Sequence, residues 1–144
     1  MEKSKVSYWL DKLGASGLLL GPAESSVRLV ADGAYNGTYQ LTEGMGILTG
    51  GITAWNASKY IDEHNNKIKR SPLVHAGRAL EVGGSAATEY RLVNGGSGNI
   101  FHDFGPVAIG IPVGAFLEYV AGPVHEKFSK KYRKEDEKSI TPIS

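Results

Sequence analysis

The chain has 144 residues, enough for one domain with a sizeable core, and its formal net charge of +1 gives no electrostatic case for nucleic-acid binding. It contains no cysteine, which excludes disulfides, thiolate metal sites and cysteine nucleophiles. Its 19 glycines are about twice the average frequency and lie inside apolar segments rather than in a Gly/Ser linker, so we expect a folded chain.

Residues 4–13 predict a short amphipathic helix. Its apolar side is expected to carry Val6, Trp9, Leu10 and Leu13. Asp11 and Lys12 interrupt this segment, so it does not fit a signal peptide and we expect cytoplasmic synthesis, with membrane association left open. Gly14, Gly17 and the pair Gly21-Pro22 are expected to end the helix.

Residues 24–62 predict a glycine-rich central helix, because its apolar residues recur at spacings of three, four and seven. Gly33, Gly37, Gly44 and Gly51 would then form one stripe on which another helix packs at close range. Glycine costs about 1 kcal/mol per helix-interior position, so we expect a kink or break near residues 44–51. A similar step, two glycines four residues apart, recurs at Gly17–Gly21, Gly46–Gly50 and Gly110–Gly114.

The second half begins after a polar connector, residues 61–70. Ser71-Pro72 is a strong helix start, and the helix should run to Val93 with a weak point at Gly83-Gly84. Its expected buried residues are Leu73, Val74, Leu80, Tyr90 and Val93. A loop follows at residues 94–99. Further helices should begin at Gly105-Pro106, with a kink at Pro112, and at Gly122-Pro123. The fold class is therefore all-α, with four to five helices in one domain, residues 1–134, and a frayed tail, residues 135–144.

Phe101-His102-Asp103-Phe104-Gly105 is the sharpest candidate for chemistry. It lies between a glycine loop and a helix start, where His102 could act as a general base and Asp103 could hold a cation or orient a partner. The segment His-Asp-Phe-Gly resembles the dyad of secreted bacterial phospholipases A, which implies a His that activates water and an Asp that binds calcium. The flanking cysteines of that family are absent, and Pro106 replaces its following tyrosine. The alternative is that Asp103 caps a helix and His102 packs beside it.

Five basic residues follow the apolar segment Pro106–Val124. They are Lys127, Lys130, Lys131, Arg133 and Lys134. This order is typical of a segment that contacts an anionic membrane surface, but the alternative of a solvated helix face is preferred. Glu118 and two prolines lie within the apolar segment, which argues against a plain membrane span.

Three function classes stay open. The first is a helical association or membrane-active module, such as an effector or toxin-type domain, with a membrane surface or a partner protein as its target. The second is a phospholipase-like hydrolase at His102 and Asp103, and the third is a structural subunit that assembles, for example as a homo-oligomer, through its glycine stripe. No histidine pair has metal-ligand spacing on one helical face, so neither a metal nor a cofactor is predicted, and the balance leans away from an enzyme.

Overall fold

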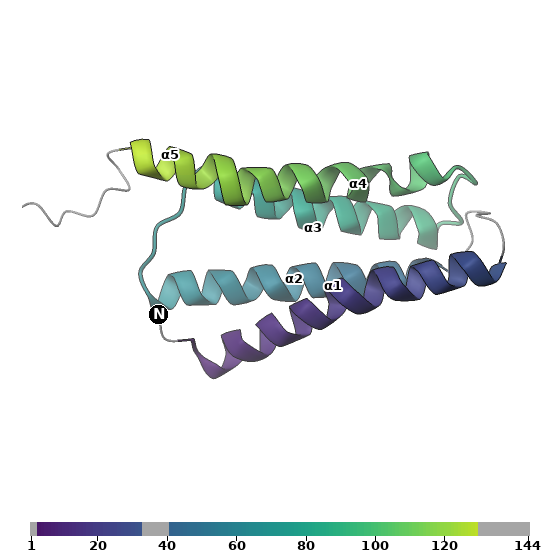
Figure 1. The fold of residues 1–144 in the computed structure, drawn as a ribbon, viewed down its shortest axis with the longest axis horizontal. Coiled ribbons are helices and arrows are strands. Elements are labelled where there is room, and N and C mark those ends of the chain that lie inside the picture. The colour runs from purple at the N-terminus through teal and green to yellow at the C-terminus, as the bar shows by residue number, and fades with distance from the viewer. Residues whose placement is uncertain (1–2, 33–40, 130–144) are drawn as a thin grey trace, which may run out of the picture.

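The computed structural model describes residues 3–32 and 41–129 (Figure 1), and every regular element in them is helical. The elements are α1 (Lys5–Asp32), α2 (Thr42–Asn65), α3 (Pro72–Val93), α4 (Ile100–Phe116), the π-helical turn η2 (Leu117–Ala121) and α5 (Gly122–Phe128). The predicted all-α class with four to five helices is confirmed. The expected tail, residues 135–144, lies outside the described residues.

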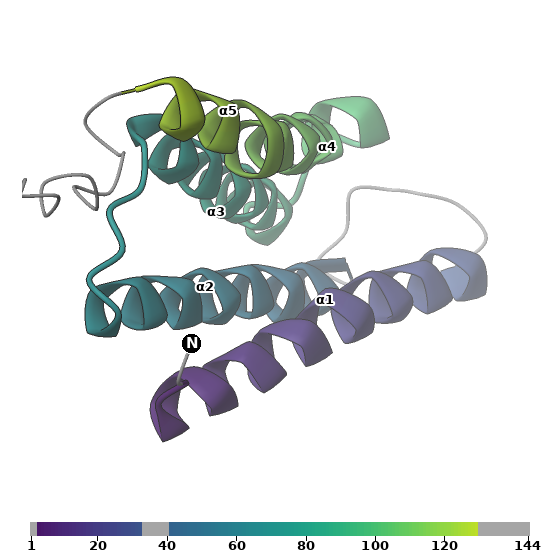
Figure 2. The same cartoon turned by 60° about the vertical axis from the view of Figure 1, so that its left-hand side comes forward.

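Two antiparallel hairpins make up the fold. α1 packs along α2, and α3 packs along the continuous rod of α4, η2 and α5. Figure 2 shows the hairpins as two layers, and α2 and α3 are the only helices of different layers whose backbones approach closely in the described part of the chain. A small apolar core lies between the layers at the end away from the α2–α3 connection, formed by Leu41, Met45, Leu48, Ile52 and Leu92.

Side-chain caps explain where two of the helices begin. The Ser71 hydroxyl accepts the Leu73 backbone N–H at 3.1 Å, and Pro72 occupies the first turn, as the Ser-Pro pair predicts. Asn99 caps α4 by accepting the backbone N–H groups of Phe101 and His102. The fourth helix therefore starts at Ile100 rather than at Gly105-Pro106, because the Asn99 cap lies six residues upstream of Gly105.

The turn η2 interrupts the regular pattern of the fourth rod. The backbone N–H of Gly122 donates to the Leu117 carbonyl, five residues back, and Pro123 has no N–H to continue the ladder. α4 continues through Pro112 as α-helix, and the wider turn begins five residues later, at Leu117. This wider turn places Glu118 on the buried side of the rod.

The glycines do not break the first two helices, contrary to expectation. α1 runs without interruption through Gly14, Gly17 and Gly21-Pro22, and α2 runs through residues 44–51. The single helix expected over residues 24–62 is instead the end of α1 and the whole of α2, and α2 extends to Asn65 into the expected connector. α3 likewise continues through Gly83-Gly84. Contacts between the helices offset the helix-propensity cost that led to the predicted breaks.

Candidate functional site

Glycine-to-backbone contacts join α3 to α4. A Cβ atom added at Gly114 would lie 2.5 Å from the Gly77 carbonyl oxygen, and one added at Gly84 would lie 2.6 Å from the Pro106 carbonyl oxygen and 3.0 Å from the Gly110 Cα. No side chain fits at such distances, so the two backbones touch along the hairpin. Small residues at this spacing let two helices pack closely where burial of apolar surface supplies little driving force.

The same arrangement joins α1 to α2. A Cβ at Gly17 would lie 2.5 Å from the Gly51 Cα, and one at Gly21 would lie 2.7 Å from the Gly44 carbonyl oxygen. Two members of the proposed stripe, Gly44 and Gly51, thus face another helix, and that helix is α1. The other two, Gly33 and Gly37, lie outside the described residues.

Large apolar side chains point outward from these hairpins. Among the described residues, 22 large apolar or aromatic side chains are exposed, whereas six are buried. Fully buried positions are occupied mostly by small or polar residues, including Ser7, Ser58, Ser71, Ser85 and Thr88. Of the expected core of α3, Val74 is buried, but Leu80, Tyr90 and Val93 are exposed because the glycine face, not the large apolar face, meets the partner helix.

The α4–η2–α5 rod shows most plainly this distribution, with small residues buried and large apolar residues exposed. Its buried face repeats every four residues as Gly110, Gly114, Glu118 and Gly122. The opposite side exposes a stripe of large apolar residues at Ile109, Val113, Phe116, Val120 and Val124. Residues Ile100–Phe128 form a helix long and apolar enough to cross a membrane by length and composition, and only 22 % of its most apolar window is buried.

The stretch of this rod that carries a single charged side chain has the length of a bilayer core. The only ionisable carboxylate or cation between Asp103 and His125 is Glu118, which is 5 % exposed. The intervening residues, 104–124, would span about 31 Å at 1.5 Å per residue, against about 30 Å for the hydrocarbon core.

A buried ionic cluster holds the two hairpins together at the end near the α2–α3 connection. Arg78 of α3 donates to both carboxylate oxygens of Glu63 on α2, each at 2.7 Å, and to Glu118 of η2 at 2.8 Å. Lys59 of α2 reaches Glu118 at 2.9 Å. Arg70 binds Glu63 from the connecting loop at 2.9 Å. Each charge is paired, which is what burial of such groups requires.

The electrostatics of the cluster keep Glu63 ionised. Burial pushes the pKa of Glu63 upward, but hydrogen bonds from Arg78 and Arg70 outweigh it and hold the pKa below its ordinary value. Burial also works against the Arg70 charge, while the bonds to Glu63 and Glu126 raise the pKa of Arg70. Glu63 therefore remains ionised at neutral pH, and its bonds to Arg78 and Arg70 favour one arrangement of the hairpins.

His102 and Asp103 are adjacent in space, and Asp103 also links the preceding loop to α4. The His102 Nδ1 lies 3.2 Å from Asp103 Oδ1, with the histidine side chain 60 % exposed. Both Asp103 oxygens accept the Ser97 backbone N–H, at 3.0 and 2.8 Å, and Asp103 is 1 % exposed. The carboxylate thus ties the glycine loop to α4, while Asn99 is the cap. Within the described residues no group of three His, Asp or Glu side chains could hold a metal ion.

The structure describes only one residue of the predicted basic cluster. Lys127 is exposed in the last turn of α5, beside His125, while Lys130, Lys131, Arg133 and Lys134 lie outside the described residues. Comparison with known proteins adds no identification, since no family model, curated protein or solved structure matches this chain.

Sequence reasoning missed the ionic cluster and the packing glycines of α3, Gly77 and Gly84. A signal for each was present. Gly77 and Gly84 are seven residues apart, the same helical spacing used for the central stripe, and Glu118 is a single charge inside an apolar run. Such a charge indicates a buried partner, and Arg78 is that partner.

Proposed function

We propose that the protein is a membrane-active helical module whose α4–η2–α5 rod, packed against α3, inserts into the lipid bilayer. The observation that supports this most is the inverted side-chain distribution of the rod, with glycine and a paired glutamate inside and large apolar residues outside. In water such an exposed apolar face favours aggregation, whereas in a bilayer it contacts lipid chains.

Glycine packing supports the same proposal. Between lipid-exposed helices the hydrophobic effect does not drive association, so close backbone contact and van der Waals packing must hold the pair. The contacts of Gly77 with Gly114 and of Gly84 with Gly110 supply that packing. The Arg78–Glu118 pair leaves no unpaired charge on the lipid side of the rod.

The ends of the rod fit a membrane boundary. His102 and Asp103 lie at one end and His125 and Lys127 at the other, and the basic residues that follow Lys127 in the chain would meet anionic headgroups. Each basic residue near such a surface contributes about 1 kcal/mol, weakened by salt. This orientation makes the module selective for anionic bilayers.

The test is Ile109→Lys, with Val6→Lys as its matched control. Both side chains are well exposed, at 67 % and 61 %, so neither substitution removes a buried contact in water. A lysine at the bilayer centre costs about 2.5–3.5 kcal/mol on insertion scales, which is an upper value for position 109, about 7.5 Å from the centre of the 104–124 stretch. A lysine in the first turn of α1 lies outside the proposed span. Co-sedimentation with anionic vesicles and dye leakage measure insertion and the effector- or toxin-type activity.

We expect the unmodified protein and Val6→Lys to bind anionic vesicles and release dye, and Ile109→Lys to lose both with an unchanged circular dichroism spectrum. Equal binding by the three proteins, or none to any vesicle, contradicts insertion. The second result would favour a structural subunit, which size-exclusion chromatography would show as a stable oligomer.

A further inference from the structure

The end of the molecule that holds the α2–α3 connection also gathers the start of α1 and the end of α5 (Figure 1). The Ser7 hydroxyl donates to the Ser58 carbonyl of α2 at 3.3 Å, and the Ser71 backbone N–H donates to Glu126 of α5 at 2.7 Å. We call residues 3–12, 59–71 and 125–129 the basic end. All seven lysines of the described residues belong to it: Lys3, Lys5, Lys12, Lys59, Lys67, Lys69 and Lys127.

The lysines of the basic end face solvent, whereas its carboxylates do not. All of the lysines except Lys59 are exposed. Lys3 pairs with Asp11 at 2.9 Å, but no ion pair within the described residues engages the other five exposed lysines. The four carboxylates of this end are buried or half-buried: Asp11, Asp62, Glu63 and Glu126. The solvent-facing surface of the basic end is therefore positive.

The charge balance stays positive when the buried neighbours are counted. With Arg70, the basic end holds eight cations against its four carboxylates, an excess of four positive charges. The adjoining ionic cluster adds Arg78 against Glu118 and Glu81, which leaves an excess of three. Burial raises the pKa of Glu81, which disfavours its negative charge further.

Amphipathic aromatic rings lie among these lysines. Trp9 is 65 % exposed in the first turns of α1, and Tyr8 beside it has its ring centroid 5.6 Å from the Lys12 ammonium. The second tryptophan of the chain, Trp55, lies one turn before Lys59, whose ammonium is 4.2 Å from its ring centroid. Tryptophan and tyrosine are enriched where proteins meet the headgroup layer of a bilayer, because their rings are apolar with a polar edge.

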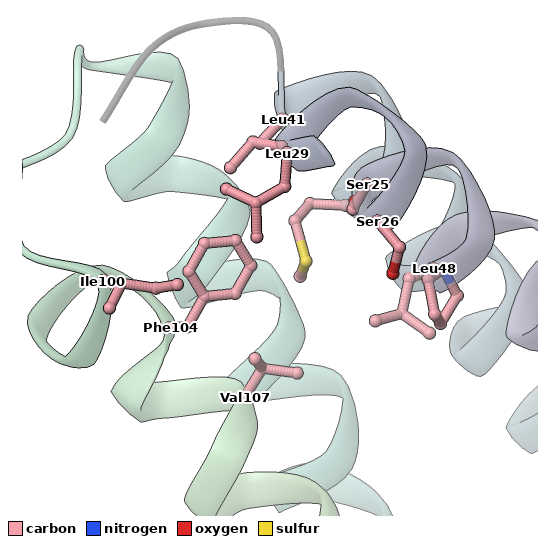
Figure 3. Close-up of a pocket in the computed structure, with 10 residues that line it drawn as sticks. Ser25, Ser26, Leu29, Leu41, Leu48, Ile100, Phe104 and Val107 are labelled. Carbon is pink, nitrogen blue, oxygen red and sulfur yellow. The ribbon is translucent and has the colours of Figure 1, made fainter. Parts of the chain in front are cut away.

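The opposite end of the molecule has neither feature. Figure 3 shows Leu29, Phe104 and Val107 lining an apolar pocket between the hairpins there. The charged side chains described in that half are Arg28 and Arg91 against Glu24, Glu43, Glu89 and Asp103, an excess of two negative charges. The molecule therefore carries opposite charge at its two ends, and an anionic surface attracts the basic end and repels the other.

We propose that the basic end docks on an anionic phospholipid surface, with its lysines at the headgroup phosphates and Trp9 and Tyr8 at the boundary with the acyl chains. Charge alone would also suit an acidic protein, but exposed amphipathic rings beside lysines match the layered chemistry of a bilayer. Docking goes beyond the insertion proposed above. It assigns a role to the start of α1 and to the α2–α3 connection, and it does not require the rod to enter the bilayer.

Tryptophan fluorescence tests the docking, because the chain has two tryptophans and both report on this end. The triple variant Lys5→Gln/Lys69→Gln/Lys127→Gln removes one unpaired cation from each of the three segments. Its matched control, Ala23→Glu/Ala86→Glu/Phe101→Glu, lowers the formal net charge by the same amount at exposed positions of the opposite half. Each protein is also prepared with Ile109→Lys, so that docking is measured without insertion.

The titrations use phosphatidylglycerol-containing and pure phosphatidylcholine vesicles at an ionic strength of about 0.01 M, where the Debye length is about 30 Å. We expect only the anionic vesicles to shift tryptophan emission to shorter wavelength, with or without Ile109→Lys. Lipids brominated near the headgroup should quench more strongly than lipids brominated near the chain end. Each lysine contributes about fivefold in binding, so the triple lysine variant should bind about a hundredfold more weakly, and its control within about twofold of the unmodified protein.

Equal binding by the triple lysine variant and its control overturns the docking proposal, as does equal binding to neutral vesicles or stronger quenching by the deeper bromines. A larger emission shift with polyglutamate than with vesicles would assign the basic end to an acidic protein and also overturn it. Insertion is decided separately, by dye release and co-sedimentation of Ile109→Lys at physiological ionic strength, where docking alone is screened. Unchanged dye release in Ile109→Lys defeats only insertion, and binding that does not depend on the three lysines defeats only docking.

Discussion

Adjacent glycines in one helix provide a direct test of the backbone-to-backbone packing. Gly83 and Gly84 are neighbours in α3, yet a Cβ at Gly83 meets nothing within 4 Å, whereas one at Gly84 would collide with the Pro106 carbonyl and the Gly110 Cα. The two Gly→Ala substitutions therefore change the same chemical group and differ only in what it meets.

The expected magnitudes separate clearly. Both alanines gain about 1 kcal/mol of helix propensity relative to glycine. Gly84→Ala also forces α3 and α4 apart, and overpacking of this kind costs about 1–3 kcal/mol. With a change of about 4 °C in melting temperature per kcal/mol, Gly84→Ala should melt about 4–12 °C below Gly83→Ala.

Thermal denaturation followed by far-ultraviolet circular dichroism measures this difference. Gly50→Ala and Gly51→Ala repeat the comparison in the first hairpin, since Gly50 faces open space and Gly51 would meet the Gly17 Cα at 2.7 Å. Equal melting temperatures within both pairs would refute the conclusion that glycine contacts hold the hairpins together.

Three further outcomes follow from the ionic cluster and the loop before α4. Glu63→Gln should lower the free energy of unfolding by about 1.5–3 kcal/mol at neutral pH, because it removes a charged acceptor from Arg78. Folding lowers the pKa of Glu63, so the stability difference between Glu63→Gln and the unmodified protein should be complete above pH 4.5, the ordinary pKa of a glutamate. The difference should disappear as the pH falls through the lower pKa of the folded state. Denaturant titrations across pH measure this difference, and a constant difference would contradict the role of the ion pair. Asn99→Ala should cost about 1 kcal/mol through loss of the α4 cap, and denaturant unfolding that matches the unmodified protein would argue against that cap. His102→Ala should change the melting temperature by no more than about 1 °C, since the side chain is mostly exposed. A calcium-dependent esterase assay of this variant and the unmodified protein tests the hydrolase hypothesis. That hypothesis survives only if the unmodified protein hydrolyses the ester and the variant does not.

Local signals in the sequence located the elements whose causes are local. Ser71-Pro72 predicts the start of α3 because a hydroxyl cap and a proline act within one turn, and Gly122-Pro123 marks the start of α5 for the same kind of reason. The glycine loop at residues 94–99 was also predictable, since Gly95 and Gly98 adopt positive φ angles that other residues avoid. The all-α class followed from apolar spacings of three and four residues.

The tertiary structure alone decided what the glycines do. A glycine in a helix interior carries the same propensity cost whether it faces solvent, as Gly83 does, or another backbone, as Gly84 does, so the sequence predicted breaks where the chain has contacts. The tertiary structure also decided that Glu118 meets Arg78, 40 positions away in the same hairpin, and Lys59, 59 positions away in the other hairpin. Propensity and periodicity are properties of one segment, whereas close packing and charge pairing depend on which segments meet in space.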